Sequence, residues 1–74
     1  MMGQHIYRVM VSYVDKIGRS RSYSRDFHTM GEAEAFEAQK LSQSGRWVLL
    51  VEMWKEGNTV HCTPLRDGWQ IKRG

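Results

Sequence analysis

The 74-residue chain has few of the features that would tie it to a membrane, an oxidising compartment or a metal. Its one cysteine, Cys62, excludes an internal disulfide and makes a four-ligand structural zinc site unexpected. No segment reaches the length of a membrane span, and the amino-terminal residues lack the apolar core of a secretory signal. We therefore expect a soluble, unprocessed, cytoplasmic protein with no membrane partner, no metal and no cofactor.

Catalytic motifs are missing as well, because the sequence shows no Ser-His-Asp ordering, no paired carboxylates with a pocket and no phosphate-binding glycine loop. His61 and Cys62 are adjacent, so on a strand they point to opposite faces and cannot jointly bind one metal ion. We expect Cys62 to be a small buried residue and His28 to lie in a loop. A chain this small offers little room for a water-excluding pocket, so we expect a binding module and not an enzyme.

One stretch, residues 29–45, has the signals of a helix. Thr29 can accept a hydrogen bond from the backbone N–H of Glu32 while the Glu32 carboxylate reaches back, which is a capping box. Gly45 is expected to end the helix in the left-handed conformation. The apolar positions at helical spacing are Met30, Ala33, Phe36 and Leu41. This pattern predicts a helix that packs with one side on a sheet.

The segment before the helix predicts a β-hairpin. Apolar and polar residues alternate from Ile6 to Val14, and a second strand runs from Arg19 to Phe27. Lys16-Ile17-Gly18 suits a three-residue loop with Gly18 in the left-handed position, which sets the register. The predicted pairs are Tyr7 with Phe27, Arg8 with Asp26, Val9 with Arg25, Val11 with Tyr23, Ser12 with Ser22 and Tyr13 with Arg21.

The segment after the helix predicts a second hairpin. Residues 46–55 form the most hydrophobic run of the chain, which suits a central strand. Gly57-Asn58 is a two-residue turn signal, and Pro64 cannot donate a ladder hydrogen bond. The predicted pairs are Glu56 with Thr59, Trp54 with His61, Met53 with Cys62 and Glu52 with Thr63. Residues 69–72 could form a short last strand.

Together these elements predict a single α+β domain spanning residues 1–74. Its order is β-β-α-β-β, with an optional last strand, in an antiparallel sheet that carries one helix on one face. We expect Trp47 to pack under the helix with Leu49 and Val51, and Trp54 to lie on the opposite face. Either that second face is an exposed apolar patch, or the last strand with Trp69 folds across and covers it.

Positive charge gathers around the first hairpin. The chain has a net charge of +3, and the acidic residues concentrate in and beside the helix. Arginines that alternate with aromatic residues suit the phosphates and bases of nucleic acid. The candidate nucleic-acid contacts are Lys16, Arg19, Arg21, Tyr23 and Arg25. Two other interpretations stay open: a solubilising surface, and an edge strand protected against sheet-to-sheet aggregation.

The run from Gly18 to Phe36 resembles the strand-to-helix segment of the arm-binding domain of phage and transposon integrases. In both, a basic strand ends in Phe-x-Thr, here Phe27 and Thr29, and leads into a helix that begins with Glu-Ala. The resemblance implies a phage or mobile-element source and a sheet that docks in the major groove of DNA. The residues that it assigns to DNA contact are Arg19, Arg21, Tyr23 and Arg25.

A different kind of partner is suggested by the tryptophan content, three in so short a chain. An exposed tryptophan beside arginine is typical of a protein interaction hot spot or of a homodimer contact. The candidate protein-interaction residues are Trp54, His61 and Trp69. In size and architecture the chain is also similar to small phage and plasmid proteins, among them anti-CRISPR inhibitors. That similarity implies docking onto a nucleic-acid-handling protein complex.

Overall fold

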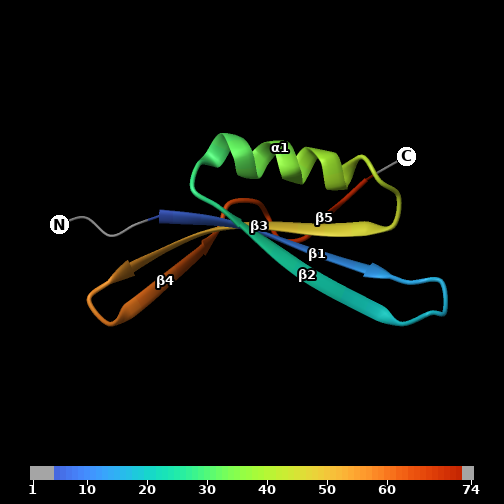
Figure 1. The fold of residues 1–74 in the computed structure, drawn as a ribbon, viewed down its shortest axis with the longest axis horizontal. Coiled ribbons are helices and arrows are strands. Elements are labelled where there is room, and N and C mark those ends of the chain that lie inside the picture. Colours follow the sequence, from blue (N-terminus) through green and yellow to red (C-terminus); the bar gives the residue numbers. More distant parts are fainter. Residues whose placement is uncertain (1–4, 73–74) are drawn as a thin grey trace.

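Five strands and one helix succeed one another in the computed structural model, which describes residues 5–72 (Figure 1). The elements are β1 (His5–Val14), β2 (Ser20–Phe27), α1 (Met30–Leu41), β3 (Arg46–Glu56), β4 (Thr59–Pro64) and β5 (Gln70–Ile71). The antiparallel sheet has the order β2-β1-β3-β4, and β5 also pairs with β3. The predicted α+β class and element order are confirmed. No helix within the described residues is long and apolar enough to cross a membrane.

The β1–β2 hairpin has the predicted loop and the predicted register. The Asp15 N–H donates to the Arg19 carbonyl at 2.9 Å, and the Gly18 N–H donates to the Asp15 carbonyl at 3.0 Å. Gly18 has a φ of 85°, the left-handed value that closes a three-residue loop with a bulge. Every predicted pair is present, from Tyr7 opposite Phe27 to Tyr13 opposite Arg21.

The β3–β4 hairpin also has the predicted pairs, from Glu52 opposite Thr63 to Glu56 opposite Thr59. Gly57 has a φ of 59° whereas Asn58 does not have a positive φ, which is the pattern of a type II′ turn. Pro64 is the last residue of β4. The strand therefore ends where the chain loses a backbone donor.

The helix begins as its sequence predicts. Thr29 is extended, and its hydroxyl oxygen accepts a hydrogen bond from the Glu32 N–H at 3.3 Å. The Glu32 carboxylate accepts from the Thr29 hydroxyl at 2.9 Å, in place of the backbone N–H of a full capping box. The helix ends at Leu41, with Ser42 as its C-cap. Gly45 has a φ of 76° but lies in the turn to β3, beyond the helix end.

The core lies between α1 and one face of the central strands β1 and β3. Its fully buried residues are Val9, Val11, Ala33, Val48 and Leu50. Because Val9 pairs with Leu50 and Val11 with Val48, the even-numbered residues of β3 face the helix. We call this the helix side of the sheet, and the other face the open side.

This arrangement overturns one expectation. Trp47 and Leu49 do not pack under the helix, because they lie on the open side, where Trp47 is 46% exposed. Val51, on the same side, is only 3% exposed. Trp54 shares a face with Val48 and Leu50, and that face is the helix side, not the opposite face on which Trp54 was expected.

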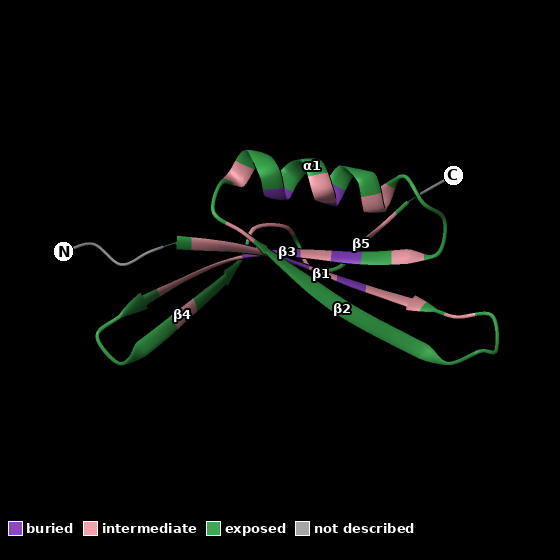
Figure 2. Ribbon diagram, in the orientation of Figure 1, coloured by how far each residue is buried: buried purple, intermediate pink, exposed green. Residues whose placement is uncertain are grey.

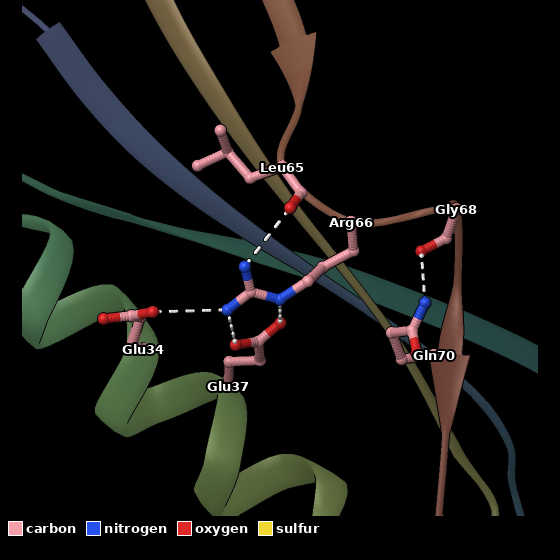
Figure 3. Close-up of polar contacts among 6 residues, drawn as sticks. All are labelled: Glu34, Glu37, Leu65, Arg66, Gly68 and Gln70. Atoms are coloured by element: carbon pink, nitrogen blue, oxygen red, sulfur yellow. Dashed lines mark hydrogen bonds and ion pairs between the residues drawn. The ribbon is translucent and has the colours of Figure 1, made fainter.

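An arginine from the loop between β4 and β5 is bonded to the helix (Figure 3). The Nε and Nη2 atoms of Arg66 donate to the two carboxylate oxygens of Glu37 at 3.2 and 2.9 Å, and Nη2 also donates to Glu34 at 3.3 Å. Hydrogen bonding to Glu37 raises the pKa of Arg66 above its ordinary value. Since Glu37 is 6% exposed, Arg66 neutralises a charge at the edge of the core.

The molecule is elongated, with dimensions of 46 × 23 × 19 Å. The helix covers the middle of the sheet, and the β1–β2 and β3–β4 hairpins extend beyond it in different directions (Figure 1). Strand β2 is exposed along its whole length except at Phe27 (Figure 2). The arm that carries the predicted basic residues therefore projects from the body into solvent.

Candidate nucleic-acid interface

The predicted basic residues lie together on the projecting β1–β2 hairpin. Arg21, Tyr23 and Arg25 share the helix side of β2. Arg25 and Tyr23 pair with the core residues Val9 and Val11, and Arg21 pairs with Tyr13 on the same face. Lys16 and Arg19 lie in the loop and at its end. All five are exposed, and Tyr23 is 41% exposed. The five predicted residues thus lie on the edge strand β2 and in the loop that precedes it.

The arginines nearest the loop are oriented by Asp15. Its carboxylate accepts hydrogen bonds from the backbone N–H of Arg19 at 2.9 Å and from Nε of Arg21 at 3.0 Å. These bonds lower the pKa of Asp15 below its ordinary value, and the bond from the Arg19 N–H contributes most. The Arg21 side chain is still 53% exposed. The bond from Nε therefore orients the Arg21 guanidinium, and its other N–H groups can still donate to an anion.

Arg25 is held by aromatic rings. Its guanidinium carbon lies 5.6 Å from the ring centre of Phe27 and 5.5 Å from that of Phe36 on the helix. The two rings are themselves 5.4 Å apart. Arg25 therefore covers the outer edge of the core while its charge remains in water.

Two further cations adjoin this surface. The Arg46 guanidinium lies 4.5 Å from the ring centre of Tyr13, and Lys40 Nζ lies 5.1 Å from that of Phe36. Tyr13 and Tyr23 meet edge to face at 6.3 Å. We call the resulting surface the basic strip; it consists of Tyr13, Arg21, Tyr23, Arg25, Lys40 and Arg46. Sequence reasoning missed Arg46 because only the pairing of β1 with β3 sets it opposite Tyr13.

Arg8 is also in the hairpin, but its charge is neutralised. It forms a two-pronged contact with Asp26, Nε to Oδ1 at 2.7 Å and Nη2 to Oδ2 at 3.0 Å. The hydrogen bond from Arg8 lowers the pKa of Asp26. This pair lies on the open side, opposite the basic strip. On the helix side Arg21 is likewise paired with a carboxylate, that of Asp15, whereas among residues 5–72 Arg25 and Arg46 form no ion pair.

The predicted protein-interaction residues do not form one patch. Trp54 is stacked between His5 and His61, with ring centres 5.5 and 4.8 Å apart and planes 12° apart in both pairs. His5 Nδ1 is 2.8 Å from Glu52. Trp69 lies elsewhere, lining a hollow with Met10 of β1. Trp54 and His61 are thus close together, whereas Trp69 belongs to a different site.

Strand β5 does not cover Trp54. It pairs with β3 at Trp47 and Val48, toward the other end of that strand. The large hydrophobic strand residues exposed on the open side, with Trp69 beside them, are Val14 at 64%, Trp47 at 46%, Val60 at 59% and Trp69 at 44%. The exposed apolar residues therefore lie mainly on the open side, and one of them, Val60, lines a small hollow together with Trp54.

Two smaller predictions concern possible chemistry. Cys62 was expected to be buried and is exposed, because it lies on the outer strand β4, on the side that no helix covers. His28 is exposed between β2 and α1, as predicted. Among residues 5–72, no group of three or more His, Cys, Asp or Glu side chains is arranged to hold a metal ion.

Comparison of the chain with protein-family models, with curated proteins and with solved structures finds no match. The resemblances to integrase arm-binding domains and to anti-CRISPR proteins therefore stay predictions. The observation that bears on function is the geometry of the hairpin itself, where arginines alternate with tyrosine along one exposed edge strand.

Proposed function

We propose that this chain is a non-enzymatic binding module that engages the phosphate backbone of nucleic acid, free or within a nucleic-acid-handling complex, through the β1–β2 hairpin. The observation that carries the proposal is the basic strip. It presents Arg21 and Arg25 of β2 around Tyr13 and Tyr23, with Arg46 at the start of β3 beside Tyr13. Lys16 and Arg19 extend this positive surface to the tip of the arm.

The proposed attraction between the hairpin and nucleic acid is electrostatic. Phosphates condense counterions, and their release by lysine and arginine supplies most of the affinity for nucleic acid without regard to sequence. Within residues 5–72, no hydrogen bond or ion pair engages the side chains of Lys16 and Arg19. The tyrosines add surfaces on which an unpaired base can stack. A mobile-element source and a cytoplasmic location are consistent with this role and belong to the same proposal.

The test is a double charge reversal, Arg21→Glu with Arg25→Glu. We expect binding to mixed-sequence DNA at low salt to weaken by about 1,000-fold, because each reversal removes an attraction of about 1 kcal/mol and adds a repulsion of about the same size. The slope of log affinity against log salt should become shallower by about 2, one unit per lost phosphate contact. Fluorescence anisotropy with labelled DNA measures both.

The matched control is Lys55→Glu with Lys72→Glu, which changes the net charge by the same amount at exposed positions outside the hairpin. It should weaken binding far less. Circular dichroism of both variants checks that the fold is kept, since Arg25 covers Phe36. Equal losses in the two double variants, or unchanged binding in the first, would contradict the proposal.

A second candidate function is protein binding, as an inhibitor, an adaptor or a homodimer. The observation in its favour is the exposure of Trp47 and Trp69 on the open side. Such an interface should tolerate salt and be lost in Trp47→Ala, whereas the double charge reversal should leave it unchanged. A homodimer through β2, centred on Tyr23, is less favoured because it would bring Arg21 of one copy opposite Arg25 of the other.

A further inference from the structure

A hollow of about 500 Å³ opens on the open side of the β1–β2 hairpin. It lies across β2 from the basic strip, since successive residues of a strand point to opposite faces. Its lining residues are Met10, Ser12, Ser22, Tyr23, Ser24 and Trp69. The hollow is therefore made by the first hairpin and by the segment just before β5, which brings Trp69 beside it.

The lining combines an apolar surface with a row of hydroxyls. Trp69 is 44% exposed, and Met10 is half-buried. Ser12 and Ser22 are directly opposite each other in the register, and Ser24 is opposite Met10. Among residues 5–72 no hydrogen bond engages the hydroxyls of these three serines. A flat ring with a polar edge would find an aromatic face and free hydroxyl groups here.

The position of the hollow relates it to the basic strip. Ser22 and Ser24 alternate along β2 with Arg21, Tyr23 and Arg25, at about 3.4 Å per residue. Strand β2 is at the edge of the sheet, so no further strand separates its two faces on the outer side. A chain of nucleotides lying along this edge could place phosphates near the arginines and turn a base toward the serines.

We infer that the hollow binds an unpaired nucleobase, so that the preferred ligand of the hairpin is single-stranded nucleic acid. This inference rests on the proposed function, since the arginines supply the phosphate contacts. A base in a duplex is already stacked and paired and must be extruded before it can enter, at a cost of a few kcal/mol. A single strand offers its bases freely, and stacking on an aromatic side chain then adds affinity.

The experiment compares two ligands with equal numbers of phosphates: a short oligothymidylate and an abasic oligomer of the same length. The native protein should bind oligothymidylate about tenfold more tightly, which is the contribution of one stacked base. Trp69→Ala should remove this preference and leave the affinity for the abasic oligomer unchanged. Val60→Ala is the control, because Val60 is an exposed apolar residue on the same side of the sheet but does not line this hollow.

A second variant protects the test against a folding defect in Trp69→Ala. Ser24→Leu fills the hollow from an exposed strand position and should remove the same preference. Equal affinity of the native protein for both oligomers overturns the inference but leaves the proposed function standing. Equal effects of Trp69→Ala and Val60→Ala also overturn it. If neither oligomer binds at low salt, both the inference and the proposed function are wrong.

Discussion

Leu50→Ala is expected to lower the free energy of unfolding by about 3–5 kcal/mol, whereas Leu49→Ala should cost only about 1–2 kcal/mol. The two leucines are neighbours in β3, but Leu50 is fully buried between the sheet and α1 while Leu49 is half-buried on the open side. Truncating Leu50 removes its contacts with Val9 and leaves a cavity that the surrounding residues cannot fill completely.

Urea denaturation of the native protein and the two variants measures the difference. A small domain of this size has a stability of only several kcal/mol, so Leu50→Ala could be largely unfolded even without denaturant. A larger loss for Leu49→Ala than for Leu50→Ala would show that the helix packs on the other face of the sheet.

Arg66→Met is expected to cost about 2–4 kcal/mol, because it leaves the carboxylate of Glu37 at the edge of the core without a counter-charge. The Glu37 side chain is 7% exposed, and Arg66 binds both of its oxygens. The chain offers a control of the same geometry. Arg8 binds Asp26 through two donors as well, but the Asp26 side chain is 42% exposed. Arg8→Met should therefore cost about 1 kcal/mol or less.

A double-mutant cycle completes this test. Replacing both partners, in Arg66→Met with Glu37→Leu, should recover most of the stability that Arg66→Met loses, since apolar residues of similar size can replace a buried ion pair. Thermal and urea unfolding give the four free energies. Equal costs for Arg66→Met and Arg8→Met would mean that the burial of Glu37 adds nothing to the pair.

The hairpins could be predicted from sequence because turn chemistry fixes their register. Gly18 must close a three-residue loop and Gly57 a two-residue one, and each turn allows only one alignment of its strands. The same alignment predicts that the serines of β2 lie on one face of the hairpin and Arg21 and Arg25 on the other. The helix start followed from Thr29 and Glu32, whose hydrogen bonds involve only neighbouring residues.

The face of β3 could not be predicted in the same way. Residues 47–51 are apolar at every position, so alternation gives no sign of which side meets the helix. The pairing of β1 with β3 determines which side of β3 meets the helix, and these two strands are far apart in sequence, with β2 and α1 between them. The same long-range pairing brings Arg46 to Tyr13, so Arg46 could not be predicted from the sequence as part of the candidate site.

Arg66 was missed for a related reason. It lies in an irregular segment between β4 and β5, where no periodicity indicates a partner. Its partner Glu37 lies in the helix, but which cation meets that carboxylate depends on how the chain returns after Pro64. Trp69 likewise reaches its hollow only through that return.

The measurement that tests the central claim most directly is a salt titration of binding to mixed-sequence duplex and single-stranded DNA, followed by NMR mapping of the shifted amides. We expect log affinity to fall linearly with log salt, and the shifted amides to cluster at residues 16–27 and at Arg46. Absence of binding at low salt, or shifts confined to the open side around Trp47 and Val60, would contradict the claim and leave the positive charge as a solubilising surface.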